Sequence, residues 1–152
     1  MKITEVSAAL QGIVSDIPNT YFMRATSQDA NIELDQISLR QKTVVIFNNL
    51  PTINNTIGAG GYVSQEFPIE LQILKLDQVD EKTDGSDMIR DTCSIVANTI
   101  FDRLNDVFTN QLTPIENYEL NYLGEAKIYD DVFTGVRLRF TILLNRDVYY
   151  CD

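Results

Sequence analysis

Two stretches of the chain carry apolar residues at every third or fourth position, the spacing that gathers them on one side of an α-helix. The first stretch, residues 3–15, ends before Asp16 and Pro18, which stop a helix. The second stretch, residues 86–108, has an apolar row at spacings of 4, 3, 4, 4 and 3, formed by Ile89, Cys93, Val96, Ile100, Leu104 and Val107. Because packing supplies most of the stability of a helix, we expect a sheet or a partner helix to cover this row.

Segments before the second helix follow β patterns. Residues 21–25 predict a short strand, and residues 43–47 form a β-branched and aromatic run that is typical of an interior strand covered on both faces. Residues 67–76 alternate apolar and polar side chains, and Pro68 favours a strand that begins there or lies at a sheet edge. The apolar residues of the segment 32–39 fit neither the helical spacing nor the alternation of a strand, so we expect this segment to be irregular.

The last third of the chain also predicts strands. Tyr118, Leu120 and Tyr122 alternate with polar residues, and we expect them to pack in the core. Residues 127–129 and 137–142 are expected to flank a turn around residues 130–135. The second of these segments predicts an inward-facing row of Leu138, Phe140, Ile142 and Leu144.

These segments predict one α+β domain over residues 1–152, in the order α-β-β-β-α-β-β. Its sheet is expected to be mainly antiparallel, with both helices packed on one face. Residues 48–64 are rich in Asn, Pro, Gly and Thr and predict a long exposed loop, which is a candidate contact arm because long loops in compact domains are often functional. The candidate subunit or partner contacts are Ile53, Ile57 and Tyr62 in this loop and Tyr149 and Tyr150 near the C-terminus. The two terminal tyrosines fit docking on the protein's own sheet equally well.

Composition and charge narrow the classes of function. A chain of 152 residues with 44% hydrophobic content suits one domain with a sizeable core. Its 22 acidic and 12 basic residues leave a formal net charge of −10, which repels nucleic-acid phosphates and anionic lipid surfaces. No apolar run is long enough to predict a membrane span, and the acid early in the N-terminal segment does not fit a secretory signal, so we expect a cytosolic origin.

The residues available for catalysis are few. The chain has no histidine, which excludes Ser-His-Asp and Cys-His nucleophile arrangements and imidazole-based metal sites. Its two cysteines, Cys93 and Cys151, are expected to be free thiols, and Cys93 lies in the apolar row, where burial raises a thiol pKa. The acidic chain offers carboxylate pairs, such as Glu119 and Glu125. A carboxylate-based enzyme is therefore the catalytic class that stays open.

Neither of the two motif-like segments predicts a ligand site. In the acidic stretch from Asp77 to Asp87, alignment of Gly85 with the glycine of a calcium-binding EF-hand loop puts Lys82 at an oxygen-ligand position. That stretch is better explained as a solvated helix entrance matched to the helix dipole. The glycine-rich segment 58–61 lacks the Lys-Ser/Thr of a phosphate-binding loop. We therefore expect no cofactor and no bound metal.

The order of segments resembles that of small structural proteins of tailed bacteriophages, in particular the tail-terminator or neck-ring class of head-tail connector proteins. The resemblance spans residues 32–145 and is carried by the run TVVIF at 43–47, the long polar excursion, FPIELQILKLD at 67–77, the long helix, and YDDVFTGV at 129–136. It implies a non-enzymatic subunit, made in the host cytoplasm, that forms a homo-oligomeric ring around the DNA passage of the virion and contacts other neck or tail proteins. No functional motif is carried over by it, and no membrane partner is implied.

A different class of function stays open beside the one that this resemblance implies. The acidic composition also fits a small acidic binding or inhibitor protein that engages a basic partner, as a monomer or dimer with strongly salt-dependent affinity.

Overall fold

The chain forms an α+β fold with one mixed sheet. The computed structural model describes residues 3–25, 42–48, 54–57, 63–76, 83–110, 115–126 and 133–146. Their elements are α1 (Ile3–Ser15), β1 (Thr20–Ala25), β2 (Thr43–Asn48), β3 (Asn54–Ile57), β4 (Val63–Leu76), α3 (Thr83–Asn110), β5 (Ile115–Ala126) and β6 (Phe133–Arg146). The predicted class and the order α-β-β-β-α-β-β are confirmed, and the structure adds the short strand β3 within the segment predicted as a loop.

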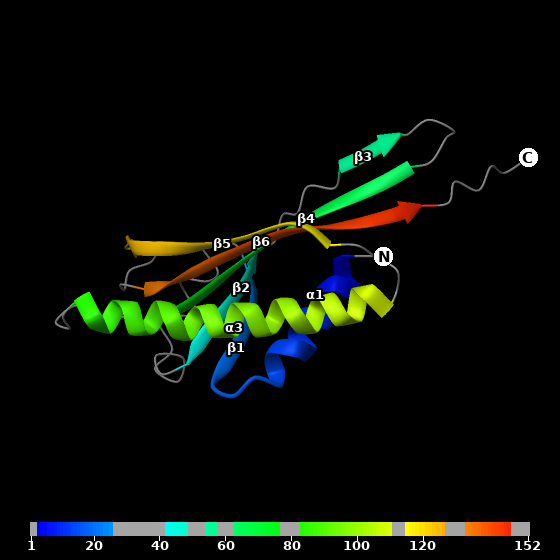
Figure 1. Ribbon diagram of the computed structural model, residues 1–152. Helices are drawn as coiled ribbons and strands as arrows, with labels where there is room; N and C mark the ends of the chain where they lie inside the picture. The colour runs from blue at the N-terminus through cyan, green and yellow to red at the C-terminus, as the bar shows by residue number, and fades with distance from the viewer. Residues whose placement is uncertain are drawn as a thin grey trace, which may run out of the picture.

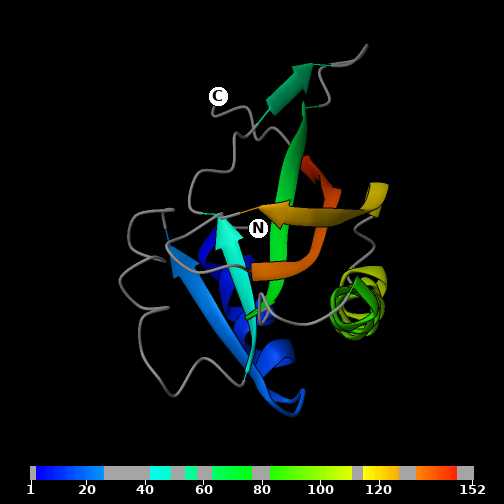
Figure 2. The same cartoon turned by 90° about the vertical axis from the view of Figure 1, so that its left-hand side faces the viewer.

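The strands pair in the order β1-β2-β4-β6-β5, with β3 attached to the start of β4. Only β1 and β2 run parallel, and the other pairs are antiparallel, as predicted for most of the sheet. Figure 2 looks nearly along α3 and shows how strongly the sheet twists between β1 and β5.

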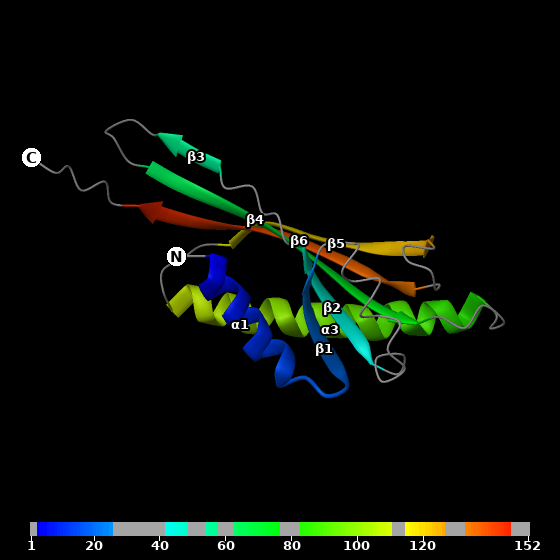
Figure 3. The same ribbon diagram turned by 180° about the vertical axis from the view of Figure 1, so that it is seen from behind.

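Both helices pack on the same face of the sheet, which confirms the predicted arrangement (Figures 1 and 3). Their apolar rows meet the inward residues of β2, β4 and β6, and alternation along those strands supplies every second side chain. The core between helices and sheet includes Val6, Leu10, Val14, Val45, Phe47, Ile69, Leu71, Ile73, Cys93, Ala97, Ile100, Leu104, Val136, Leu138, Phe140 and Ile142.

The opposite face of the sheet has its own smaller apolar cluster. It consists of Met23, Val44, Ile46, Leu74 and Phe133, all of which are buried. In β2, Val44 and Ile46 face this cluster, whereas Val45 and Phe47 face the helices. The two-sided burial explains why residues 43–47 contain no alternating polar positions, and β2 is an interior strand as predicted.

Strand β4 begins at Val63, earlier than the predicted start near Phe67. On one side it pairs with β6 along its whole length; on the other side it pairs with β3 over residues 63–66 and with β2 over residues 71–74. Pro68 lies in the gap between those two partners. The predicted edge position of Pro68 is therefore correct locally, because a residue without an N–H is tolerated where a ladder partner is missing.

Strand β6 includes residues that were predicted to turn. Thr134 and Gly135 pair with Lys75 and Leu74 of β4 in the regular register. A side chain on Gly135 would clash with the carbonyl oxygen of Ile73, so this glycine permits close strand approach instead of a turn. The expected segments 32–39 and 127–129 lie outside the described residues.

Candidate interaction surfaces

The sheet extends beyond the helices at one end (Figures 1 and 3). This extension is made of residues 54–57 of β3, 63–66 of β4 and 143–146 of β6, and we call it the β arm. Strand β5 pairs with β6 no further than Ile142, and β2 pairs with β4 only from Leu71, so three strands alone continue into the β arm. Figures 1 and 3 show it projecting away from the layer of α1 and α3.

The β arm occupies much of the segment predicted as a contact loop. Ile57 ends β3 and pairs with Val63 across the β3–β4 ladder. The other proposed contact residues, Ile53, Tyr62, Tyr149 and Tyr150, lie outside the described residues. The polar composition of residues 54–56 suggested a loop, but the backbone hydrogen bonds to β4 override this weak local propensity.

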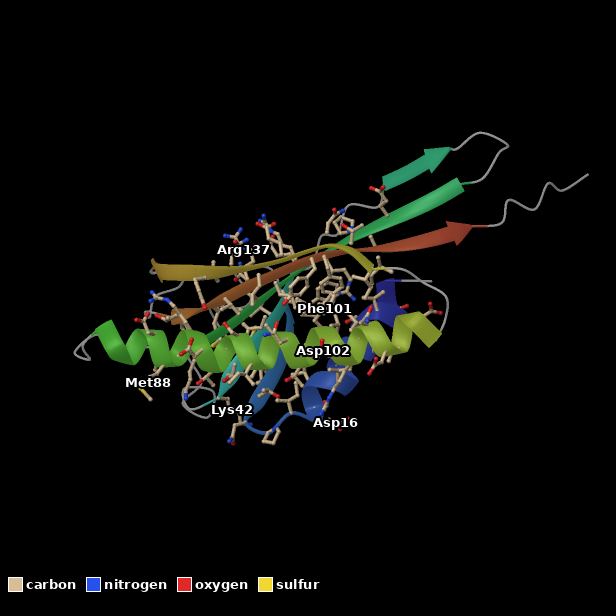
Figure 4. All side chains as sticks on the ribbon, viewed as in Figure 1. Asp16, Lys42, Met88, Phe101, Asp102 and Arg137 are labelled. Carbon is tan, nitrogen blue, oxygen red and sulfur yellow. The ribbon has the colours of Figure 1, made fainter. Side chains whose placement is uncertain are left out.

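The outward side of α3 carries an apolar row that the sequence-based expectations did not include. We call Met88, Thr92, Ile95 and Thr99 the α3 ridge. The side chains of Met88 and Ile95 are 72% and 68% exposed. The hydroxyls of Thr92 and Thr99 donate to the carbonyl oxygens of Met88 and Ile95 at 2.9 and 2.8 Å, so their hydrogen-bonding capacity is partly used within the helix. In Figure 4 Met88 points away from the sheet, whereas Phe101 points toward it.

A row of tyrosines lines the junction of β5 and α3. Tyr118 and Tyr122 were predicted to be core residues, and this is wrong: they are 43% and 66% exposed. The alternation identified the face correctly, but β5 is the last strand of the sheet and α3 covers only part of it. Tyr118 packs against Phe101 with ring centroids 4.2 Å apart and ring planes tilted by 54°, and it donates a 2.6 Å hydrogen bond to Asn98 Oδ1. Partial burial, followed by the charge of Asp102, raises the pKa of Tyr118.

A shallow cleft of about 470 Å³ opens beside Tyr122 and is lined by Asp87, Arg90, Asp91 and Tyr122. Arg90 donates to Asp87 at 2.9 Å, and its Nε atom is buried without a hydrogen-bond partner. These side chains provide two carboxylates, a guanidinium and one phenol ring. Among the described residues, no group of three or more cysteine or acidic side chains is placed to hold a metal ion.

Beside its smaller apolar cluster, the helix-free face of β4, β5 and β6 also carries interacting polar side chains. Arg139 donates to Glu70 at 2.7 Å, and the Asn121 amide donates to Glu119 at 2.6 Å. Glu119, one member of the carboxylate pair considered from the sequence, is therefore engaged on this open surface. The cross-strand contact of Arg139 with Glu70 and the contact within β5 explain the polar positions of these strands as surface stabilisation.

Cys93 has the environment that its place in the apolar row predicts. Its side chain is fully buried, and burial raises its pKa from 9.0 to about 12, against a smaller opposing effect of Lys75. A thiol of this kind is protonated at neutral pH and unreactive. The prediction of a structural role is consistent with this geometry. Val107, predicted in the same row, is 38% exposed because it lies near the end of α3.

Comparison with known proteins adds no family: no protein-family model and no curated protein matches this chain. Within the described part of the chain, no helix is long and apolar enough to cross a membrane.

Proposed function

We propose that this protein is a non-enzymatic structural subunit of a tailed-bacteriophage virion, where it forms a homo-oligomeric ring at the neck or tail end. The β arm is the observation that carries the proposal. Its three strands continue past the part of the sheet that both helices cover (Figure 1). Projecting strands of this kind suit contacts between subunits, because an open strand edge can pair with the backbone of another chain.

The charge of the chain supports a ring through which DNA passes. The formal net charge is −10, and acidic walls repel phosphate instead of holding it. The order of segments resembles the tail-terminator and neck-ring class, whose subunits surround such a passage. The proposed partners are further copies of the chain and the neighbouring neck or tail proteins of the virion.

Two measurements test the proposal. Sedimentation velocity over a wide concentration range should show discrete growth from monomer to one closed oligomer, visible as rings by negative-stain microscopy. Mass spectrometry of purified virions should detect the chain as a fixed component. A protein that stays monomeric at all concentrations and is absent from virions would contradict the proposal.

The acidic surface of α3 favours one alternative. Asp87, Asp91, Asp102 and Asp106 are exposed along this helix and suit a basic partner. A small acidic binding or inhibitor protein would remain a monomer or dimer, and it would bind that partner less tightly as salt is raised.

A further inference from the structure

Strand β5 is the last strand on its side of the sheet, and among the described residues only β6 pairs with it. An edge strand presents a row of N–H and C=O groups to which a strand of another chain can be added. β5 is long for this position, because it runs over 12 residues from Ile115 to Ala126. A straight edge of this length would be a template for association.

The pairing of β5 with β6 is interrupted twice. At each interruption β5 has two residues where β6 has one. The first interruption is at residues 117–118, opposite Phe140, and the second is at residues 124–125, opposite Thr134. Both have the form of a β-bulge, which leaves an extra residue unpaired, bends the strand and increases its local twist.

Each bulge begins with a residue type that suits a left-handed backbone. Asn117 has φ 56°, and Asn19 is the only other non-glycine residue of the described part with a positive φ. Asparagine tolerates this region better than most residues with a side chain. Gly124 has the corresponding first place in the second bulge, where glycine is the preferred residue. The local sequence therefore favours both bulges.

The first bulge is also held in place by packing. Residues three apart, such as Ile115 and Tyr118, lie on opposite faces of a regular strand. Here Ile115 packs on the core between helices and sheet, and Tyr118 packs on Phe101 of α3. The extra residue brings both side chains to the helix side, and the start of β5 bends toward the helix layer (Figures 1 and 3).

We propose that the two bulges close the β5 edge to strand addition, so that no other chain, including a further copy of this one, extends the sheet beyond β5. The regular ladder between the bulges is limited to residues 119–123, and the backbone is distorted at both ends of this run. An added strand would have to match both distortions. This inference goes beyond the proposed function, since it applies to an isolated chain as well as to a subunit of a ring.

Deletion of the extra residues tests the proposal. Removal of Asn117 and Gly124 restores one-to-one pairing of β5 with β6 and leaves the other side chains of β5 on their present faces. The straightened edge should pair with β5 of a second copy, which raises the weight-average mass in sedimentation equilibrium about twofold or more over that of the unaltered chain at equal concentration. The infrared amide I band of intermolecular antiparallel sheet should appear with it. High salt in these measurements screens the three glutamates of β5, Glu116, Glu119 and Glu125.

Two substitutions keep the chain length and serve as controls. Asn117→Gly retains the bulge, because glycine adopts the same positive φ, and its mass should equal that of the unaltered chain. Asn117→Val disfavours a positive φ and should raise the mass, which keeps the test open where the double deletion does not fold, as judged by circular dichroism. A folded double deletion with the mass of the unaltered chain would overturn the proposal. Equal masses for folded Asn117→Val and Asn117→Gly would overturn it as well.

Discussion

Gly135 lies where β6 approaches the backbone of β4 too closely for a side chain. A Cβ at this position would overlap the Ile73 carbonyl oxygen and lie 2.9 Å from its carbonyl carbon. Both are backbone atoms of the strand that pairs with β2 and β6, so relief of the clash requires the sheet itself to move.

We predict that Gly135→Ala lowers the free energy of unfolding by about 2 kcal/mol or more, as expected for overpacking against a fixed backbone. Urea denaturation followed by circular dichroism measures this change. Gly12→Ala is the matched control: no atom lies within 4 Å of a Cβ there, and this position of α1 is exposed, so the change should stabilise the protein by about 0.5–1 kcal/mol. Equal changes in the free energy of unfolding at the two glycines would contradict the close contact between Gly135 and the backbone of β4.

The Cys93 thiol makes stability depend on pH in a defined range. Its pKa is raised from 9.0 to about 12 in the folded chain, chiefly by burial, so between these values the folded state holds a proton that the unfolded state has lost. Stability from this group is complete below pH 9.0 and falls as the pH rises toward 12, by at most about 1.4 kcal/mol per pH unit.

Denaturation curves measured from pH 8 to pH 11 should show this decline in the free energy of unfolding, beginning near the pKa of the thiol in the unfolded chain. Cys93→Ala should be less stable than the unaltered chain at pH 8, but its stability should fall less steeply above pH 9 because the titrating group is gone. Parallel pH profiles for the two proteins would show that the thiol is not buried as described.

At the scale of elements, α3 has two apolar sides with different tasks. Ile100 is fully buried against the sheet, whereas Ile95 is 68% exposed on the ridge. The first side holds the helix on the sheet, and the second contributes nothing to the packing of the isolated chain.

We predict that Ile100→Ala lowers the free energy of unfolding by about 2–5 kcal/mol, because removal of the buried side-chain atoms leaves a cavity in the core. Ile95→Ala should change it by no more than about 0.5 kcal/mol, in the range of surface substitutions. Thermal or urea unfolding of both variants under conditions that keep the chain monomeric measures the contrast. A large loss of stability in Ile95→Ala would mean that the ridge is covered within one copy.

Strand patterns were read correctly where a side of the sheet is buried and less well elsewhere. Residues 43–47 and 67–76 were located because their apolar positions face a core. Strand β3 escaped recognition because its residues, NNTI, have weak β propensity and owe their conformation to hydrogen bonds with residues 63–66. Tyr118 and Tyr122 showed the right alternation but the wrong burial, since periodicity identifies a face and not the extent of the helix that covers it.

At the scale of the whole molecule, the net charge of −10 opposes self-association at low ionic strength. Salt screens this repulsion, because the Debye length falls from roughly 30 Å at 0.01 M to roughly 10 Å at 0.1 M. We predict that raising the salt concentration over this range increases the weight-average mass in sedimentation equilibrium, as long as the contact surface is mainly apolar.

A basic partner bound by the acidic face of α3 would respond in the opposite direction, with affinity falling as salt rises. The same titration therefore separates the two functional classes. Loss of the homo-oligomer on salt addition would count against a mainly apolar contact between copies.

By itself, the sequence determined the α+β class, the order of most elements, the buried side of each helix and the structural environment of Cys93. These properties follow from the period of apolar residues, which is a local quantity that any short window of the chain contains. Only the tertiary structure decided which strands are neighbours, where Pro68 and Gly135 are required, and which surfaces stay uncovered. The β arm exists because its strands extend beyond the helices that cover the core, and the α3 ridge stays exposed because the sheet covers only the other side of α3. The relative extent of packed layers is not encoded in any local pattern.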